Sequence, residues 1–461
     1  RMMRASALGA GVRKEARALW LPWAASAVTL AVVAADPERF GEVGSLAYGL
    51  GSISLAAMSV GHEYTNRTLP LLLSLPADRR QLLLVKLGVV TPMLGTLGAL
   101  ALVALPASTG AGPSPFPMMW VVSSMVRAVW LTLLCRSPLG GTVFAIGVTG
   151  QLHLVADVAG IIRFGWASTV IEKGEFTLSV LWWMLLAAGA VAAIGAWRAF
   201  QRLEAIDGRG LDVQWPRWPA AKATPAAAGA APFRRPLWRL VQKELRLQQM
   251  SFVVAGMHVI GWSALSAFYR NEPDAPAPLA VVGAIYAGSL ALLIGSLASA
   301  EERRMGTLEW HAMLPVAART QWVIKTGTVM VLAVLLSFVL PVLLNASDSG
   351  VRPWHAGAIL LLAIGSLFVS SLSDSGLRAL VLSAPLTIIA LWSLGWAWGM
   401  HRLSMGPLVQ VALAAFALLT LWLAFDNHQR ARMDPARLGR QVAWMTTAAA
   451  LVALVALVVM V

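Results

Sequence analysis

The sequence predicts an all-α polytopic membrane protein of about 12–13 transmembrane helices, arranged as two parallel six-helix repeats with interfacial coupling helices. Of its 461 residues, 58% are hydrophobic and only 13% are charged, whereas soluble domains carry roughly a quarter charged residues. The apolar residues gather in blocks long enough to cross the hydrocarbon core of a bilayer, which takes about 20 residues. A short pattern of charged residues also occurs in both halves of the chain. These three observations predict a membrane protein with two related halves.

Apolar blocks of spanning length define the predicted transmembrane helices. No signal-peptide cleavage site follows the first block, so we expect it to be a retained span. The predicted spans of the first half are 19–35, 44–61, 82–105, 116–134, 140–159 and 178–197. Those of the second half are 251–268, 279–300, 322–344, 356–371, 377–398 and 407–425, and a thirteenth is 442–461.

The placement of Lys and Arg predicts the orientation. With the N-terminus in the cytoplasm, 29 of the 36 basic residues fall on the cytoplasmic side, 6 fall outside, and Arg127 lies within a span. Basic loops stay cytoplasmic, so this imbalance predicts a cytoplasmic N-terminus. The net charge of +14 then faces anionic membrane lipid, and no nucleic-acid partner is expected.

Composition divides the chain into four segments. Residues 1–200 form a first six-helix unit and residues 237–425 a second one. Residues 201–236, rich in Ala, Pro and Arg, have no apolar periodicity and are expected to form a cytoplasmic linker. Residues 426–461 comprise a basic cytoplasmic segment and the extra C-terminal span.

Comparison of the two halves reveals an internal repeat. Each half opens with Lys-Glu-x-Arg, at residues 14–17 and 243–246. After the second span, residues 63–88 align with residues 302–327 without gaps. Because each unit has an even number of spans, the two units are expected to face the same way, related by an axis along the membrane normal. The identical pairs are Glu63 and Glu302, Thr68 and Thr307, Leu69 and Leu308, Leu75 and Leu314, Pro76 and Pro315, Arg80 and Arg319, Lys86 and Lys325, and Gly88 and Gly327.

The aligned segment has the composition of an interfacial helix. Residues 68–75 are mainly apolar but too short to span a bilayer, and charged residues flank them. Such a segment is expected to lie on the cytoplasmic surface with its apolar side towards the lipid. A short helix between two spans is suited to receive force from a soluble partner, because tilting it moves both spans. The residues are equally compatible with an interfacial turn that holds lipid headgroups.

The second copy of this segment resembles the hallmark loop of the ABC type-2 transporter permeases, a family of type V ABC exporter fold. It reads Glu302-Arg303-Arg304-Met305-Gly306-Thr307-Leu308-Glu309, then Leu314-Pro315, Arg319 and Lys325. The first copy keeps most of these residues but has Arg67 in place of Gly and Pro70 in place of Glu. The resemblance implies a coupling helix, with ATPase-coupling roles for Glu63, Thr68, Leu69, Pro76, Arg80, Lys86, Glu302, Gly306, Thr307, Leu308, Glu309, Pro315, Arg319 and Lys325.

The resemblance implies the permease subunit of an ATP-driven exporter in the bacterial inner membrane, moving a hydrophobic or amphipathic substrate. The chain has no Gly-x-x-x-x-Gly-Lys-[Ser/Thr] phosphate loop. ATP and Mg would therefore be bound by a separate ABC ATPase subunit, two copies per chain, and this chain would have no enzymatic site and no cofactor of its own. The alternatives are an ion-gradient-driven secondary transporter with two parallel six-helix halves, and a membrane scaffold or polytopic enzyme.

Few polar residues lie inside the predicted spans. Arg127 is the one basic residue well within a span, and such residues face a partner or water. It is either a contact on the substrate pathway, for example for an anionic headgroup, or a structural anchor between helices, or a side chain that extends to the headgroups of the inner leaflet. We do not expect it to pair with Asp157, which should lie nearer the outer face. No spacing of His, Asp or Glu predicts a metal site, and no catalytic residue is predicted. Residues 151–176 are expected to form either re-entrant helices at the outer face, as the resemblance implies, or a surface loop with an interfacial helix.

Overall fold

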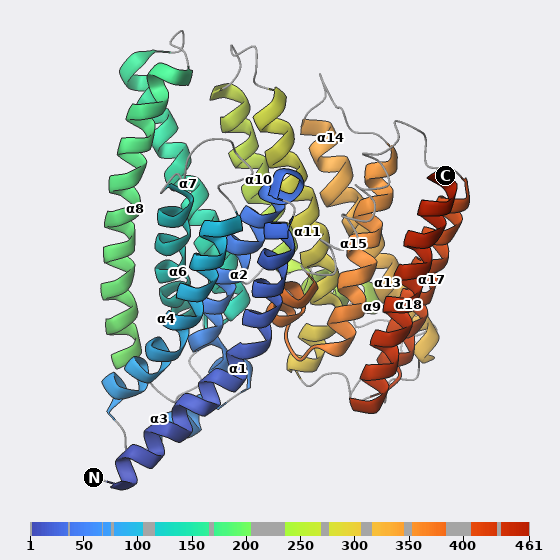
Figure 1. Cartoon of the computed structure of the whole chain (residues 1–461), viewed down its shortest axis with the longest axis horizontal. Helices are drawn as coiled ribbons and strands as arrows, with labels where there is room; N and C mark the ends of the chain where they lie inside the picture. The colour runs from blue at the N-terminus through green and yellow to red at the C-terminus, as the bar shows by residue number, and fades with distance from the viewer. Residues whose placement is uncertain are drawn as a thin grey trace, which may run out of the picture.

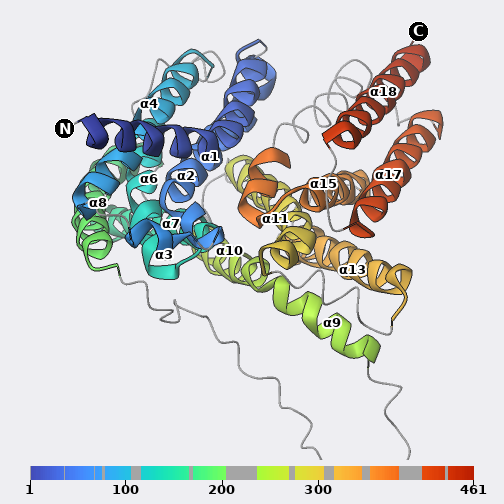
Figure 2. The same cartoon turned by 90° about the horizontal axis from the view of Figure 1, so that it is seen from below.

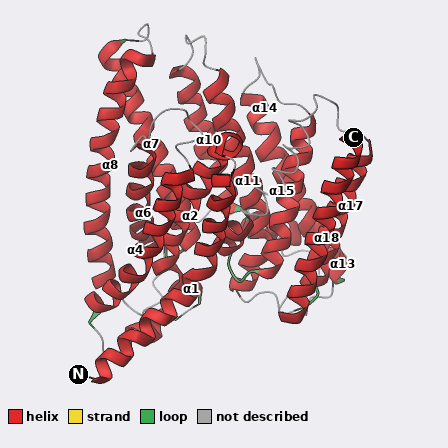
Figure 3. Ribbon diagram, in the orientation of Figure 1, coloured by secondary structure: helices red, strands yellow, loops and turns green. Residues whose placement is uncertain are grey.

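The all-α prediction is confirmed. A computed structural model describes residues 2–35, 37–66, 68–74, 78–104, 116–165, 170–203, 236–268, 276–305, 316–344, 353–383, 407–430 and 435–460. Within these ranges the chain forms helices joined by short connections, with no strand (Figures 1 and 3). Because a helix satisfies its own backbone hydrogen bonds, it is the element that apolar segments of this length can form in lipid.

The first half forms seven described helices; five of its six predicted spans lie within one of them, and the span predicted at 82–105 is described as helix up to Ala104. Between α2 and α4, the short helix α3 forms in the segment that was predicted to be interfacial. The helices are α1 (Met2–Ala35), α2 (Pro37–Thr65), α3 (Leu69–Leu73), α4 (Arg79–Ala104), α6 (Phe116–Cys135), α7 (Pro138–Phe164) and α8 (Val170–Gln201).

The second half is also built from helices, but it opens with two of them, α9 and α10, where the first half has the single helix α1. The stretch predicted at 322–344 is one continuous rod of α13, the π-helical η1 and α14. The span predicted at 377–398 is helical from 376 to 383, and residues 384–398 lie outside the described residues. The elements are α9 (Pro236–Leu247), α10 (Gln249–Phe268), α11 (Pro276–Met305), α13 (Ala318–Leu332), η1 (Ala333–Val339), α14 (Leu340–Leu344), α15 (Pro353–Leu372), α17 (Pro407–His428) and α18 (Pro435–Met460).

The helices have the length and surface of membrane-spanning segments. In the described part of the chain, eight are long and apolar enough to cross a bilayer, which makes the protein multi-pass. Large apolar side chains point outwards from them, including Trp183, which is 73% exposed, and Leu418, which is 67% exposed. Outward apolar residues on long helices are expected where lipid replaces water as the solvent. The count of 12 or 13 spans and the cytoplasmic N-terminus stay predictions.

At the far end of α7, the structure differs from the predicted re-entrant helices. Helix α7 continues to Phe164 and α8 begins at Val170, so both helices extend beyond their predicted spans. The two extensions contact each other through the rings of Phe164 and Phe176, whose centroids are 5.6 Å apart in an edge-to-face arrangement. The apolar sequence of α7, which continues through Ile161 and Ile162, favours this extension over a chain that turns back.

Small side chains allow the closest helix contacts. A Cβ on Gly295 of α11 would lie 2.4 Å from the Ala363 carbonyl oxygen of α15. One turn further along, the Ser370 hydroxyl of α15 donates to the Ser296 carbonyl at 2.7 Å and accepts the backbone N–H of Ser299 at 3.0 Å. Close approach of backbones combined with hydroxyl hydrogen bonds is how helices associate in lipid. The α11–α15 pair is therefore tightly joined.

The two halves lie side by side and meet where α7 packs against α10 (Figure 2). Glycines of α7 make room for methionines of α10: a Cβ on Gly140 would lie 3.7 Å from the Met250 side chain, and one on Gly147 only 2.5 Å from the Met257 sulfur. The N-terminal part of α1, α3 and α9 lie at the same end of the molecule (Figures 1 and 2). This end, which the basic residues predict to be cytoplasmic, holds the candidate site.

Candidate functional site: two buried lysine–glutamate clusters

Lys86 joins three helices at the predicted cytoplasmic end of the first half. Its side chain extends from α4 and is only 2% exposed. The Nζ atom donates to Glu15 Oε1 of α1 at 2.7 Å, to Glu63 Oε1 of α2 at 3.1 Å and to the Ser59 carbonyl of α2 at 3.2 Å. All three donors of the ammonium group are thereby used. A buried charge needs such full pairing, because desolvation penalises it heavily.

Two further contacts connect this cluster to its surroundings. Lys14 Nζ of α1 donates to Glu63 Oε1 at 2.9 Å, and the Lys14 side chain is 49% exposed. The Thr68 hydroxyl donates to Glu63 Oε2. Thr68 is the residue immediately before α3. Glu63 therefore links α1, α4 and the start of α3. The first cluster is defined as Lys14, Glu15, Glu63 and Lys86.

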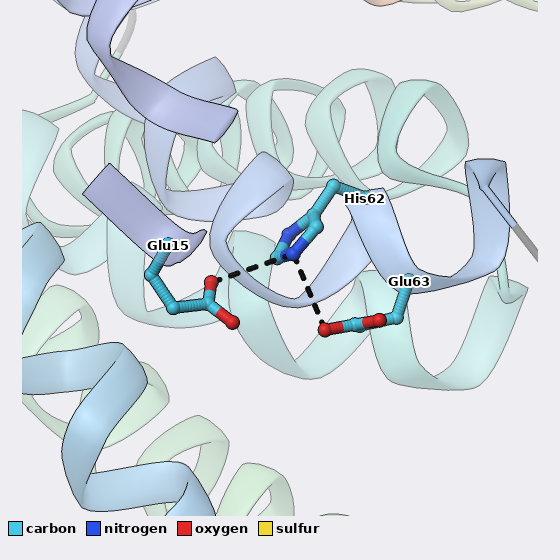
Figure 4. A group of neighbouring side chains, drawn as sticks. All are labelled: Glu15, His62 and Glu63. Carbon is cyan, nitrogen blue, oxygen red and sulfur yellow. Dashed lines mark ion pairs between the residues drawn. The ribbon is translucent and has the colours of Figure 1, made fainter. Parts of the chain in front are cut away.

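The His62 ring lies beside this cluster. Its Nδ1 atom is 2.9 Å from the Met58 carbonyl, which only accepts, so Nδ1 carries the hydrogen of that bond. Its Nε2 atom faces Glu15 Oε2 at 3.4 Å and Glu63 Oε1 at 3.3 Å (Figure 4). Burial alone would raise the pKa of Glu63, but the close His62 ring, the charge of Lys86 and the Thr68 hydroxyl outweigh it. The pKa of Glu63 therefore lies well below its ordinary value.

Glu15, His62 and Glu63 bring three potential metal ligands within 4.8 Å of one another. The sequence did not predict this grouping, because Glu15 comes from a different helix. The ammonium group of Lys86 already bonds both carboxylates. A cation added here would compete with that buried positive charge at close range, where like charges repel strongly. The donor set therefore suits a salt-bridge network better than a metal ion.

A second cluster, again of two lysines and two glutamates, lies in the other half. Lys325 of α13, 1% exposed, donates from Nζ to Glu302 Oε2 of α11 and to the Ala298 carbonyl at 2.8 Å. Lys243 of α9 donates to Glu302 Oε1 and pairs with Glu244 at 3.0 Å. Glu302 has no exposed surface. The second cluster is defined as Lys243, Glu244, Glu302 and Lys325.

The two clusters use equivalent elements. In both, an N-terminal Lys-Glu pair meets a glutamate at the end of a long helix and a lysine in the first turns of the helix that follows. In both, that lysine also bonds a backbone carbonyl one turn before the glutamate. They differ beside the glutamate, where the second half has Glu301 in place of His62, and Glu301 pairs with Arg304 at 3.2 Å.

The pairing pattern inside the second cluster also differs. Lys325 bonds Glu302 and a backbone carbonyl, and the ion pair of Glu244 is formed with Lys243, whose side chain is 29% exposed. Burial raises the pKa of Glu244, and the nearby charge of Lys325 offsets only part of this effect. The pKa of Glu244 therefore lies above its ordinary value.

The structure divides the predicted coupling residues into three groups. Glu63, Lys86, Glu302 and Lys325 are buried in the clusters. Thr68 and Leu69 are half-buried, whereas Arg80 and Arg319 are exposed at the surface. The buried residues contact their own chain and cannot touch a soluble partner in this conformation. Those that lie outside the described residues are Pro76, Gly306, Thr307, Leu308, Glu309 and Pro315.

The sequence did not predict the partners of Glu63 and Glu302. The Lys-Glu pairs at 14–15 and 243–244 were recognised as a repeated opening, but not as contacts of the coupling segment. A signal was present: a glutamate and a lysine that recur together in both halves of a chain with only 13% charged residues need partners of opposite charge when they are buried. Helix caps were also missed. The Ser137 and Ser375 hydroxyls each accept the backbone N–H three residues further on, at 3.3 and 3.4 Å.

Arg127, the predicted pathway or anchor residue, lies inside the first half and is 2% exposed. It donates from Nε to the Ser123 carbonyl at 3.1 Å, and from Nη2 to Thr149 Oγ1 at 2.7 Å and Ser124 Oγ at 3.2 Å. These bonds tie α6 to α7, as expected of an anchor. Asp157 pairs instead with His153 at 3.6 Å, in agreement with the expectation that it does not pair with Arg127. Neither a protein-family model nor a curated protein nor a solved structure matches the chain.

Proposed function

We propose that the chain is the membrane-spanning permease subunit of an ATP-driven ABC exporter, energised by separate ATPase subunits. One observation carries the proposal: in each half, a buried lysine–glutamate cluster joins the N-terminal Lys-Glu helix to the ends of two long helices, and in the first half the Thr68 hydroxyl also bonds the cluster to the interfacial segment. A protein that only spans the membrane has no need of such a junction twice. A transporter driven by a soluble partner needs a rigid link between the docking surface and the spans.

The contacts in the first half define the path of the force. Movement of α3 displaces Thr68, which is hydrogen-bonded to Glu63 at the end of α2. Glu63 is bonded in turn to Lys86 of α4 and to Lys14 of α1. Separating a buried ion pair costs about 3–5 kcal/mol, whereas an exposed pair contributes about 1 kcal/mol or less. Helices α1, α2 and α4 therefore move as one unit when α3 is tilted.

The exposed residues around α3 provide the docking surface. Leu71 is 69% exposed, and Ser74, Asp78 and Arg80 are exposed beside it. In the second half, Arg319 is exposed at the corresponding place, before the helix that carries Lys325. We therefore assign partner contact to these surface residues and a positioning role to the buried clusters. The cargo would be a hydrophobic or amphipathic molecule, and the setting would be the bacterial inner membrane.

The proposal predicts a stable complex with an ATPase. The affinity-tagged full chain would be purified from its native membranes in mild detergent, and ATP hydrolysis would be measured with and without vanadate. The double variant Arg80→Ala, Arg319→Ala removes two surface charges without disturbing either buried cluster, and we expect at least about tenfold less co-purified activity, corresponding to about 1.4 kcal/mol. Arg163→Ala at the far end of α7 removes a comparable exposed charge and should leave the activity unchanged.

Three outcomes would contradict the proposal. The first is that no vanadate-sensitive ATPase co-purifies. The second is that the double variant retains the same activity as Arg163→Ala. The third concerns reconstituted vesicles: transport that continues without ATP and stops when an ionophore collapses the ion gradient would establish the secondary-transporter alternative.

A further inference from the structure

The guanidinium group of Arg127 has hydrogen-bonding capacity that its surroundings leave unused. A guanidinium has five N–H donors and no acceptor. The Nε and Nη2 atoms bond the Ser123 carbonyl and the hydroxyls of Ser124 and Thr149. The Nη1 atom is fully buried and has no hydrogen-bond partner among the described residues. Buried polar atoms are normally satisfied, and each exception requires an explanation.

The positive charge of Arg127 also lacks a counter-charge among the described residues, where no ion pair includes it. The carboxylate of α7 is Asp157, eight residues beyond Thr149 and therefore about 12 Å further along the helix axis. It pairs with His153. Intramembrane basic residues face one another, an acidic partner or a polar cavity, because an isolated charge is expensive in an apolar medium. Among the described residues, Arg127 is thus a buried cation whose hydrogen-bond partners are all neutral acceptors.

The two hydroxyl groups fix the orientation of the guanidinium. Thr149 Oγ1 and Ser124 Oγ are hydrogen-bonded to each other at 2.7 Å, and each also lies 2.7 Å from a carbonyl oxygen of its own helix, that of Ala145 or Trp120, so these partners use both hydroxyl hydrogens and each oxygen keeps a lone pair. Their lone pairs are therefore free to accept from Nη2. Neither group can neutralise the charge, and neither bonds Nη1. The hydroxyls hold one edge of the guanidinium in place and leave its Nη1 side for a further acceptor.

A helix at the comparable position of the second half packs without a charged residue. In the second half, α15 takes the place in the order of helices that α6 takes in the first half. Helix α15 contains no Asp, Glu, Lys or Arg. It is held to α11 by serine hydroxyls and by close packing at Gly295. The corresponding helix of the other half thus packs without a buried charge. Arg127 is a specialised feature of the first half, and a role beyond joining α6 to α7 explains it.

We propose that the Nη1 side of Arg127, oriented by Ser124 and Thr149, binds an anionic group between α6 and α7. An anion supplies both the missing acceptor and the missing charge, and arginine favours oxyanions such as phosphate and carboxylate. The anion is either a free ion or the headgroup of an amphiphile. The binding site is independent of ATPase coupling. Only the assignment of the amphiphile as cargo rests on the proposed function.

The test uses the purified full chain in a neutral maltoside detergent, with thermal unfolding followed by its tryptophan fluorescence. Two probes are titrated at constant ionic strength: inorganic phosphate and dodecyl phosphate. In the wild type we expect one probe to raise the unfolding temperature, and Arg127→Gln to weaken its apparent affinity by at least about tenfold, as loss of a charged hydrogen bond implies. Arg127→Lys should retain part of the effect. Arg163→Gln, which removes an exposed charge, should retain all of it.

Each outcome decides a point. Stabilisation by inorganic phosphate identifies a free-anion site, and stabilisation by dodecyl phosphate alone identifies an amphiphile headgroup. The absence of stabilisation by either probe, or equal stabilisation of Arg127→Gln, overturns the proposal. If Arg127→Gln does not fold, Thr149→Val keeps the charge but removes one orienting hydroxyl, and an unchanged affinity in that variant also overturns it. If binding persists but dodecyl phosphate does not stimulate the co-purified ATPase, the anion site stands and its assignment to the cargo fails.

Discussion

Replacing Lys86 by methionine tests the buried junction directly. Methionine keeps most of the side-chain volume but removes the ammonium group, which bonds Glu15 at 2.7 Å and Glu63 at 3.1 Å. Both carboxylates would remain buried, with 4% and 1% exposure, and their remaining basic neighbours would be Lys14 and His62. The variant therefore leaves a net negative charge in a desolvated position.

The expected magnitude follows from burial. Removing one partner of a buried ion pair destabilises a protein by about 3–5 kcal/mol, because the other charge stays buried without compensation. Lys14→Met is the matched control in the same cluster. The Lys14 side chain is 49% exposed, and an exposed pair contributes about 1 kcal/mol or less. The two lysines should therefore differ by at least about 2 kcal/mol, although both contact Glu63.

The measurement is the free energy of unfolding in mixed micelles of a maltoside and dodecyl sulfate, followed by tryptophan fluorescence. A double variant, Lys86→Met with Glu15→Gln, removes one charge of each sign and should recover about 2 kcal/mol relative to Lys86→Met. If Lys86→Met costs no more than Lys14→Met, or if the double variant recovers nothing, then Lys86 does not hold α1, α2 and α4 together. The force path proposed above would then have no rigid link.

The remaining predictions concern packing, an amide pair and pH. Gly295→Ala should lower the free energy of unfolding by about 1–3 kcal/mol, because the added Cβ would lie 2.4 Å from a backbone oxygen of α15. The control Gly88→Ala, whose Cβ would have nothing within 4 Å, should be neutral or slightly stabilising. Asn427 and Gln441 exchange side-chain hydrogen bonds of 3.1 and 2.7 Å between α17 and α18. Asn427→Leu should lower the free energy of unfolding by about 1–3 kcal/mol, and adding Gln441→Leu should restore most of this loss. A double-mutant cycle of unfolding free energies measures both effects. The pKa of Glu63 is lowered in the folded protein from its ordinary 4.5. The ionised carboxylate therefore contributes fully to the free energy of unfolding above that pH, and this contribution is lost by up to about 1.4 kcal/mol per pH unit as the pH falls below it. Between about pH 6 and about pH 3, the free energy of unfolding should fall less steeply with pH in Glu63→Gln than in the wild type. An identical dependence on pH in the two proteins would contradict the lowered pKa of Glu63.

Much of the fold could be predicted from the sequence because lipid imposes a simple rule. Every polar backbone group in the hydrocarbon must be bonded within its own segment, so a long apolar block forms a helix whatever its neighbours are. All the predicted spans that the structure describes in full are helical, and α3 forms where a short apolar segment with charged flanks was expected. The re-entrant arrangement near Phe164 failed because it came from resemblance, while the local sequence continues a helix.

The candidate site was only half predictable. The repeat identified Glu63, Lys86, Glu302 and Lys325 as important, because an identical charge pattern in two apolar halves indicates a shared requirement. The resemblance assigned them to partner contact. The structure places them in the interior, where their bonds are to their own chain. Whether a charged residue faces a partner or a neighbouring helix depends on how the helices assemble, and periodicity within one segment does not contain that information.

The sequence alone therefore determined which segments form long apolar helices and which residues recur in the two halves. Both properties depend on hydrophobicity and spacing along the chain, which are local. Tertiary structure decided that Glu15 reaches Lys86 across 71 positions of the chain, that Lys243 meets Glu302 across 59, and that one edge of Arg127 is left without an acceptor among the described residues. Such pairings depend on the packing of whole helices against one another, because a buried charge is satisfied by whichever opposite charge the fold brings within hydrogen-bonding distance.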